Sequence, residues 1–337
     1  MEQNTGSVKN YHIKGISTMS KTTKIRWVIA HEPIRLFYRA AKDFEASLNA
    51  QQCAEKIEIE IMTPDEYSTK YNNGVVVTKH DLLDLMDQGK IEMSQMYSTW
   101  IAEKYVKDLL AFEMPFIFRD HDHATRVLEG EVGEKLLAQV KQNSNDKLRA
   151  LSYTYSGGFR CAIVNEKVST LSELVGKSVR SNRNPVAQAL WSSVGIKPYV
   201  CEIEDVTDAF EKQAITAADT VYSRVYPLNQ DKHTKTVIDS KHTLFLTTML
   251  ISESFWDTLS DEVRAVIKNA AIEAGRKERA ETIRDGQEAR DQLIKDGATI
   301  VELSAEEDAD FRNKAEKVYQ QFDDFFPVGL IEQIRKS

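Results

Sequence analysis

The sequence contains few cysteines and few residues that break regular structure. Its three cysteines, Cys53, Cys161 and Cys201, lie far apart and are odd in number. They cannot form a complete disulfide framework, so we interpret each as a small buried apolar residue. With 14 glycines and 7 prolines in 337 residues, the composition is typical of a globular protein without long disordered or fibrous stretches.

Long apolar runs are also missing. The first two dozen residues are polar and contain no run of about 7 to 15 apolar residues such as a secretory signal requires, so we expect no export signal in them. No segment reaches the roughly 18 consecutive apolar residues of a membrane span. The formal net charge of −8 is spread along the chain, which disfavours binding to nucleic acids or membrane surfaces.

Sequence motifs of the common enzyme classes are absent as well. There is no nucleophile elbow, no P-loop, no dinucleotide fingerprint and no cysteine in a histidine-containing context. Many enzymes carry only scattered site residues that folding brings together. The absence therefore favours a binding protein but does not decide against catalysis.

One cluster, Asp120-His-Asp-His123, has the residue types of a metal site. Adjacent residues cannot easily converge on one ion, and no distant cysteine or histidine motif completes a ligand set. The alternative is that Asp120 or Asp122 caps a helix starting near Ala124. We expect neither a metal nor a cofactor.

Hydrophobic periodicity predicts a two-domain α/β protein, since 337 residues are too many for one compact core. In the first part of the chain, strands separated by helices predict a mainly parallel sheet. The expected elements are a strand from Lys24, a helix at 37–48, a strand at 57–62, a helix from Asp81 to the glycine at 89 and a strand from Ile91.

The second part begins at a pair of glycines, Gly157 and Gly158, between two strand-like runs, where a chain can pass from one domain to the other. A strand ending at Arg180 precedes a polar turn, and Asn184 can then cap a helix that starts at Pro185. Such a turn before a helix N-terminus suits an anion.

The C-terminal third is predicted to be mostly helical. A helix starting after Ser260 and continuing to about Asp296 would span roughly 55 Å, longer than one small domain. It is followed by a short strand, ATIVEL, and a helix with a capping box from Ser304 to Glu307. We therefore expect residues 1–23 to form a disordered extension, 24–157 and about 246–285 to form domain I, and 158–245 and about 286–337 to form domain II.

Two arginines, Arg160 and Arg180, lie in or beside predicted strands among apolar neighbours, where an unpaired guanidinium is costly. Each could form an internal ion pair with an acidic residue. Alternatively, they could clamp a carboxylate, to which the planar fork of arginine is suited. His31 and Glu32 follow the first strand, at an edge that faces the ligand crevice in open α/β sheets, although a capping or turn role is equally compatible.

From about Lys24 onward the sequence resembles the solute receptors of TRAP (tripartite ATP-independent periplasmic) transporters. The longest similar stretch is 88–130, QGKIEMSQMYSTWIAEKYVKDLLAFEMPFIFRDHDHATRVLEG, which matches the family's order from G-x-x-x-M through P-F-x-F-R-D. Other similar features are GGFR ending at Arg160, LSELVGKSVR ending at Arg180, the helix end from Trp191 to Gly195 followed by Pro198, and FWDTLSDEVRAVI at 255–267.

The resemblance implies a periplasmic-binding-protein-like fold of class II type, with hinge strands, a long C-terminal bridging helix and closure around a solute. It also implies that Arg180 pairs with a solute carboxylate, assisted by Arg160. Tyr97, Ser98 and Trp100 would face the cleft from the first domain, and Arg183 would contribute from the turn after Arg180.

The opposite wall departs from the family pattern. The usual A-L-x-x-G-x-x-D-G is replaced by AFEKQAITA, and the position that is commonly asparagine after an acidic residue is Thr220 after Asp219. Both residues remain candidates for contact with the solute, and Tyr222 and Arg224 could substitute for the missing contact.

The function implied by the resemblance is that of a periplasmic, non-enzymatic receptor that captures an organic or sugar acid and delivers it to a membrane permease. We expect a monomer. The alternatives are a cytosolic α/β enzyme or repurposed binding domain acting on a carboxylate, and an interaction protein using its acidic, helical C-terminal part as a scaffold. The first would turn over a bound acid, and the second would show no ligand-dependent thermal shift.

Overall fold

The structure is a computed structural model that describes residues 22–337. Of the expected N-terminal extension, residues 1–23, the part from 1 to 21 lies outside the described residues. Thr22 and Thr23 already belong to the first strand, β1 (Thr22–Val28), so regular structure begins two residues before the expected start.

The first sheet has five strands in the order β2-β1-β3-β10-β4. Besides β1 these are β2 (Lys56–Met62), β3 (Met93–Tyr97), β4 (Leu148–Phe159) and β10 (Leu244–Ser252). Strand β1 is parallel to β2 and β3, whereas β10 is antiparallel to both β3 and β4. The expected parallel pairing therefore holds for β1 to β3 only, because β10 enters this sheet from the other half of the molecule and not through a crossover helix.

The second sheet has six strands in the order β11-β9-β5-β8-β6-β7. They are β5 (Cys161–Val164), β6 (Ser178–Ser181), β7 (Lys197–Val200), β8 (Ala217–Thr220), β9 (Thr236–Asp239) and β11 (Thr299–Glu302). Strand β5 is antiparallel to its neighbours β8 and β9, and the other pairs are parallel.

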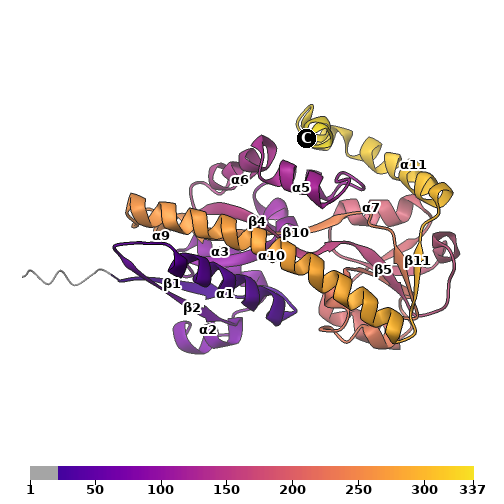
Figure 1. The fold of residues 1–337 in the computed structure, drawn as a ribbon, viewed down its shortest axis with the longest axis horizontal. Helices are drawn as coiled ribbons and strands as arrows, with labels where there is room; N and C mark the ends of the chain where they lie inside the picture. The colour runs from indigo at the N-terminus through magenta and orange to yellow at the C-terminus, as the bar shows by residue number, and fades with distance from the viewer. Residues whose placement is uncertain (1–21) are drawn as a thin grey trace, which may run out of the picture.

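Helices surround both sheets (Figure 1). The α-helices are α1 (Ile34–Ala50), α2 (Pro64–Tyr71), α3 (Leu82–Asp87), α4 (Ser98–Lys104), α5 (His121–Leu128), α6 (Glu131–Asn143), α7 (Pro185–Ser193), α8 (Val206–Glu211), α9 (Glu253–Trp256), α10 (Asp261–Lys295), α11 (Ala305–Gln321) and α12 (Leu330–Lys336). Shorter 3-10 helices are η1 (Lys79–Asp81), η2 (Lys107–Glu113), η3 (Leu171–Leu174), η4 (Ile203–Asp205), η5 (Tyr222–Arg224), η6 (Asp231–His233) and η7 (Asp323–Phe325).

Helix α10 crosses both halves of the molecule, as the sequence predicts (Figure 1). It has 35 residues, and the Ser260 hydroxyl caps it by accepting a hydrogen bond from the Val263 amide at 3.3 Å. The helix packs on α1 and β4 at one end and on η5 at the other. Gly275 allows its close approach to β4, because a Cβ there would lie 2.9 Å from the Tyr153 carbonyl oxygen. The long bridging helix is confirmed.

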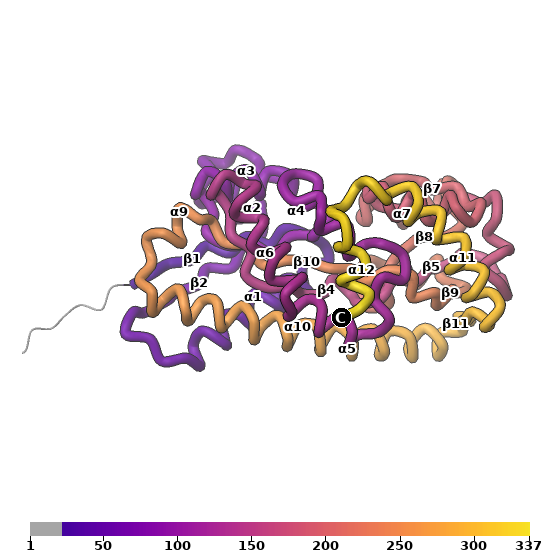
Figure 2. The backbone as a smooth tube through the Cα atoms, turned by 90° about the horizontal axis from the view of Figure 1, so that it is seen from above, coloured from indigo at the N-terminus to yellow at the C-terminus, as the bar shows by residue number. Residues whose placement is uncertain are grey.

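Two strand connections join the sheets. Strand β4 leads into β5 through the single residue Arg160, and β9 leads into β10 through residues 240–243. The Arg160 amide donates to the Thr243 carbonyl at 2.8 Å, so the two connections are hydrogen-bonded to each other. Figure 2 shows β4 and β10 running through the middle of the molecule, with α10 along one edge. The expected hinge strands are present.

The glycine pair lies inside β4, and not between two strands as expected. Gly157 and Gly158 have φ values of 131° and 80°, which glycine adopts at no steric cost. The register of β10 against β4 shifts here, between Phe245 and Leu246. At Gly157 a Cβ would lie 2.0 Å from Cγ2 of Val221, so this position has no room for a side chain.

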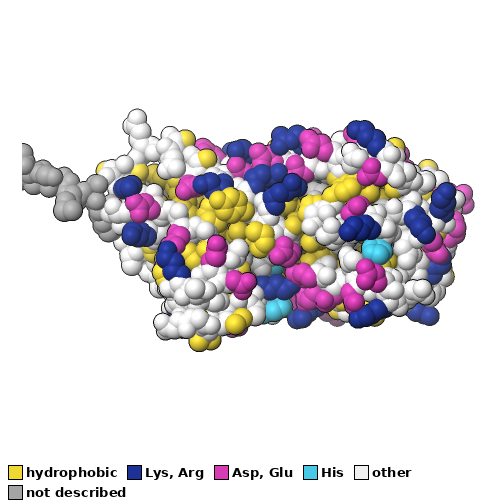
Figure 3. Space-filling model, turned by 90° about the horizontal axis from the view of Figure 1, so that it is seen from below, with side chains coloured by type: hydrophobic (Ala, Val, Ile, Leu, Met, Phe, Trp, Pro, Cys, Tyr) yellow, Lys and Arg dark blue, Asp and Glu magenta, His cyan; other side chains and the backbone are white. Residues whose placement is uncertain are grey.

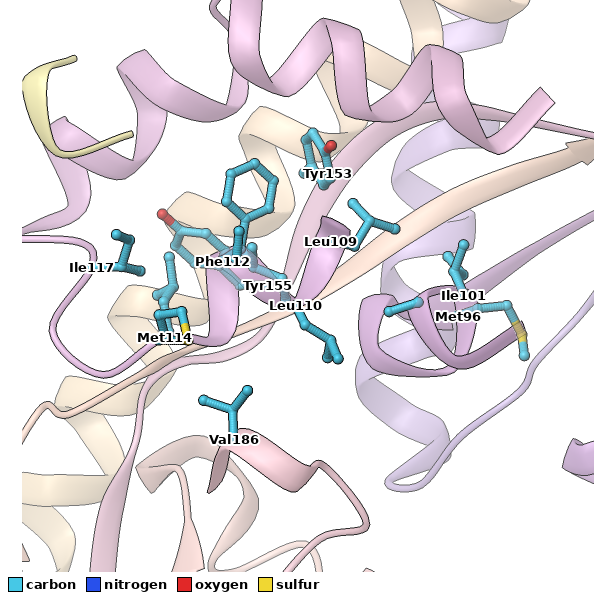
Figure 4. Packing of buried hydrophobic residues seen from close by; sticks show 14 of the residues in the cluster. Met96, Ile101, Leu109, Leu110, Phe112, Met114, Ile117, Tyr153, Tyr155 and Val186 are labelled. Carbon is cyan, nitrogen blue, oxygen red and sulfur yellow. The ribbon is translucent and has the colours of Figure 1, made fainter. Parts of the chain in front are cut away.

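Buried aromatic and aliphatic side chains fill the space beside the first sheet (Figure 4). Tyr153 of β4 lies edge-on to Phe112, with ring centroids 5.6 Å apart and planes at 83°. At the end of the chain, α12 packs against α6, and the ring Nε2 of His123 lies 2.8 Å from the Ile334 carbonyl oxygen. The C-terminal segment is therefore packed against, and hydrogen-bonded to, elements beside the first sheet.

The surface bears charges of both signs. Figure 3 shows lysine and arginine side chains interspersed with acidic ones over the face it presents, in keeping with the even charge distribution of the sequence. Within residues 22–337, no helix combines the length and the apolar character that crossing a membrane would need.

Candidate functional site

A cavity lies where the two halves of the molecule meet. Its walls come from the β3–α4 segment, the hinge, the turn after β6, the segment after β7 and the β8–η5 segment. The lining residues are Tyr97, Thr99, Trp100, Glu103, Arg160, Arg180, Asn182, Arg183, Asn184, Cys201, Glu202, Ile203, Thr220, Val221, Arg224 and Phe245.

Arg160 lies at the hinge end of the cavity and forms an internal ion pair. Its Nη1 donates to Oδ1 of Asp219 at 3.0 Å, and both side chains are buried. The guanidinium carbon lies 3.9 Å from the centroid of the Phe245 ring, a cation–π contact. Its Nη2 is buried and has no hydrogen-bond partner among the described residues, so one donor remains for a ligand.

Asp219 is held in its ionised form by this arrangement. Burial raises the pKa of its carboxyl, but Arg160 and His242 outweigh that effect, and Trp191 donates from Nε1 to Oδ2 at 3.1 Å. The net result is a pKa well below the usual range of an aspartate. Arg160 and Asp219 thus form a neutralised buried pair beneath the cavity.

Arg180, in contrast, has no acidic partner among the described residues. Its Nε donates to the Cys201 carbonyl at 3.1 Å and its Nη1 donates to the Asp219 carbonyl at 3.2 Å. The residue is 5% exposed, and burial, together with the charge of Arg160, lowers the pKa of its guanidinium. A buried cation that is hydrogen-bonded only to neutral groups is an energetic liability unless an anion joins it.

A third guanidinium, that of Arg224, enters the cavity from η5. Its Nη2 donates to the Tyr97 hydroxyl at 2.6 Å and to the Glu32 carbonyl, both of which belong to the first half of the molecule. Its carbon lies 5.3 Å from the centroid of Phe245. Phe245 is therefore flanked by two guanidinium groups, those of Arg160 and Arg224.

The sequence matches a known family over most of its length. The family model described as bacterial extracellular solute-binding protein, family 7, matches residues 34–324. The chain belongs to this family. The resemblance to TRAP receptors is thereby confirmed, and the protein is a solute-binding receptor.

Individual relatives agree with this assignment. The chain is 22% identical over 285 residues to the C4-dicarboxylate-binding periplasmic protein DctP of Rhodobacter capsulatus, covering 81% of this chain and 84% of that protein. Two solved TRAP periplasmic solute-binding proteins share the fold. One, from Shewanella oneidensis with bound succinate, has a TM-score of 0.78; the other, from Haemophilus influenzae with bound L-gulonate, has 0.80. Each is 20% identical and covers 94% of this chain, which in turn covers 99% of the solved one.

The structure brings six of the eleven predicted site residues of the receptor to the cavity wall. They are Tyr97, Trp100, Arg160, Arg180, Arg183 and Thr220. Trp100 stacks on His80 with ring centroids 4.8 Å apart, and Thr220 donates to Oε1 of Gln230 at 3.3 Å. Arg183 lies at the exposed mouth and pairs with Glu202 at 2.9 Å.

Four other predicted residues lie behind the wall. Asp219 supports Arg160, and Ser98 shares a hydrogen bond of 2.9 Å with Thr248. His31 stacks on Tyr97 at 3.5 Å between ring centroids, and its Nε2 accepts from the Tyr97 amide at 3.0 Å. Glu32 accepts from the Ile34 amide at 2.8 Å, which is the turn role left open for it. These residues position the lining ones.

Tyr222 is placed away from the cavity. Its side chain packs in the apolar cluster around β5 and β9, and burial, reinforced by Cys161 and Asp239, raises the pKa of its phenol far above the usual value. The short helix η5 turns the chain directly after β8, so that Arg224 faces the cavity and Tyr222 faces away. Of the two suggested substitutes, only Arg224 reaches the cavity.

Sequence reasoning missed several lining residues, among them Thr99, Glu103, Asn182, Ile203 and Phe245. Asn184 was expected as a helix cap, and it does accept a hydrogen bond from the Val186 amide at 2.9 Å, but it also lines the cavity. For Asn182 and Asn184, the sequence signal that could have placed them at the cavity was the polar turn after β6. Phe245 gave no signal, because it lies between two leucines, Leu244 and Leu246, at the apolar start of β10.

The cluster at 120–123 is a helix cap. Oδ1 of Asp120 accepts from the His123 amide at 2.7 Å, and α5 starts at His121, three residues earlier than expected. Within the described part of the chain, no group of three or more potential ligands is arranged to hold a metal ion.

Glu113 is expected to make the stability of the receptor depend on pH. The residue is 3% exposed beside the cavity and accepts a long hydrogen bond, 3.4 Å, from Thr99. Burial raises the pKa of its carboxyl to about 7, although Arg160 opposes the shift. The folded protein therefore keeps a proton that the unfolded chain loses above about pH 4.5, and stability should fall as the pH rises from about 4.5 to 7.

Replacing Glu113 by glutamine should remove this pH-dependent loss of unfolding free energy. For a pKa shift of this size the loss amounts to about 3 kcal/mol. Urea unfolding at pH 5 and pH 8 measures it. Wild type should lose about 3 kcal/mol more than Glu113→Gln between the two pH values. Equal losses in the two proteins would show that Glu113 does not titrate in this range.

Proposed function

We propose that this receptor captures a small carboxylate, an organic acid or a sugar acid, by closing its two halves around it and delivers it to the membrane permease of a TRAP transporter. The single observation that carries the proposal is Arg180, a buried guanidinium with no acidic partner among the described residues, facing a cavity between the two sheets. An entering carboxylate would supply the missing counter-ion. Charge-assisted hydrogen bonds of this kind contribute about 1.5–3 kcal/mol each.

The way the cavity is built supports closure. One wall belongs to elements of the first sheet and the other to elements of the second, and the connections between them are the Arg160 hinge and residues 240–243. We propose the boundaries given by the sequence, 24–157 with about 246–285 and 158–245 with about 286–337, as the two moving bodies. Hinge bending at the two strand connections would open the cavity.

Family membership supports the location and the partners. The family is described as extracellular, so we place the working receptor outside the cytoplasm, as a monomer that does not bind nucleic acid. The same membership disfavours the cytosolic enzyme or repurposed binding domain. Turnover of a bound acid would nevertheless identify an enzyme directly.

A thermal-shift screen tests the proposal. Succinate, L-gulonate, D-glucuronate and 2-oxo acids are compared with neutral analogues, succinamide and D-glucose. An acid at 100 times its dissociation constant should stabilise the receptor by about 2.7 kcal/mol, and the neutral analogue should not. The proposal fails if no acid raises Tm, or if the neutral analogues raise it equally.

A further inference from the structure

A cluster of charges crosses the mouth of the cavity. Nζ of Lys79, in η1 beside the first sheet, lies 3.1 Å from Oε2 of Glu202 and 2.9 and 3.0 Å from the two carboxylate oxygens of Glu204. Glu202 and Glu204 follow β7 of the second sheet. The contact therefore joins the two halves of the molecule between residues that lie more than a hundred positions apart in the sequence.

This cluster is balanced and partly shielded from solvent. The Lys79 side chain is 21% exposed, and those of Glu202 and Glu204 are 30% and 36% exposed. Glu202 also pairs with Arg183, so two cations face two carboxylates. Burial lowers the pKa of the Lys79 ammonium, but the two glutamates outweigh this effect and raise it above its usual value. Such a network is stronger than an isolated exposed pair.

The cluster is also connected to the solute-binding arginine. Cys201, whose carbonyl accepts from Nε of Arg180, is the residue directly before Glu202. On the other side, His80 follows Lys79 and stacks on Trp100, which lines the cavity. A movement of either half that opens the cavity must therefore break the contacts of Lys79.

We propose that Lys79, Glu202 and Glu204 form an ionic latch that holds the receptor closed and sets the residence time of the solute. The proposal rests on the closure described under the proposed function. Opening the latch separates three charged groups whose partners lie in the opposite half. Breaking it should speed release of the solute while leaving the Arg180 site intact.

Dissociation kinetics test the latch. The probe is succinate, L-gulonate or D-glucuronate, whichever of these acids raises Tm. Lys79→Ala should release it about three- to tenfold faster than wild type, as expected for the loss of one partly buried ion-pair network. Lys70→Ala is the matched control, because Lys70 pairs with Glu60 within the same half and its loss removes the same charge. Lys70→Ala should leave the release rate unchanged.

Two further variants separate a latch from a merely structural role. Glu204→Gln removes a charge of the cluster that lies in the other half of the molecule, and it should also speed release. Lys79→Glu should release the acid faster than Lys79→Ala, and the exchanged pair Lys79→Glu/Glu204→Lys should recover most of the wild-type rate. In about 1 M salt, where charges are screened within about 3 Å, the difference between wild type and Lys79→Ala should shrink. Equal release rates for Lys79→Ala and Lys70→Ala would overturn the latch.

Hydrogen exchange tests the same contact without any solute. In Lys79→Ala, the amides of residues 202–206 in the opposite half should exchange faster than in wild type and in Lys70→Ala. Unchanged exchange there would contradict the latch. If wild type bound none of the acids, the proposed function would fail, and the exchange experiment would still decide whether Lys79 holds the two halves together.

Discussion

Replacing Arg180 by alanine should weaken binding of the acid at least a hundredfold and leave Tm of the solute-free receptor unchanged or slightly higher. The first effect follows because two charge-assisted hydrogen bonds of about 1.5–3 kcal/mol each are lost. The second follows because Arg180 is buried with only neutral carbonyls as partners among the described residues, so its charge costs desolvation free energy in the empty receptor. Arg180→Ala should thus lose affinity for the acid without losing stability.

Titration calorimetry measures the affinity, and thermal unfolding measures the stability. Arg279 provides the control, because it is as deeply buried as Arg180 but lies on α10 away from the cavity. It donates to the Tyr153 carbonyl at 2.8 Å and pairs with Glu129. Arg279→Ala should lower Tm and keep the affinity, the reverse of Arg180→Ala. Normal affinity in Arg180→Ala would remove this residue from the site.

Replacing Asp219 by alanine should destabilise the receptor by about 3–5 kcal/mol, the cost of leaving one buried member of an ion pair uncompensated. Asp219 neutralises Arg160 and accepts from Nε1 of Trp191. Because the pKa of Asp219 lies below the usual range, the pair stays ionised at any pH at which the protein is handled.

Urea unfolding monitored by circular dichroism gives this free energy. The informative comparison is the double variant Arg160→Met/Asp219→Leu, which removes both charges. It should be more stable than Asp219→Ala, since an apolar pair can replace a buried ion pair with little loss. A loss below about 1 kcal/mol in Asp219→Ala would mean that solvent reaches Arg160 and that the pair is not truly buried.

The order of strands and helices could be predicted from local signals. The caps of α10 at Ser260 and α7 at Asn184 lie where the sequence placed them, because a capping side chain needs only neighbours two or three residues away. The direction of β10 could not be predicted, since it depends on which sheet the chain enters after the hinge. Periodicity contains no information about that choice.

The site was predictable only where a residue type was conspicuous. Arg160 and Arg180 stood out as cations among apolar neighbours, but the sequence offered two alternatives for both, and the structure gives a different outcome for each. Arg160 has the internal ion pair, with Asp219, and Arg180 does not. The reason is geometric. Strand β8 places the Asp219 side chain toward the hinge and presents only its carbonyl to Arg180, a difference that no spacing rule shows.

Contacts across the cavity were beyond sequence reasoning altogether. Arg224 reaches Tyr97, and Lys79 reaches Glu204, over separations of 127 and 125 residues. The sequence marks Tyr97 and Arg224 as separate candidates without pairing them, and Lys79 and Glu204 are unremarkable within their own segments. Only the fold, with its two halves brought together by β4, β10 and α10, makes them partners.

The position of the acid in a crystal structure of the complex tests the central claim most directly. The acid with the largest thermal shift is bound to wild type, and the distances from its carboxylate oxygens to the guanidinium of Arg180 are measured. We predict contacts of about 2.7–2.9 Å, typical of charge-assisted hydrogen bonds, within the cavity between the two halves. A carboxylate that points away from Arg180, or an acid bound elsewhere on the molecule, would contradict the account.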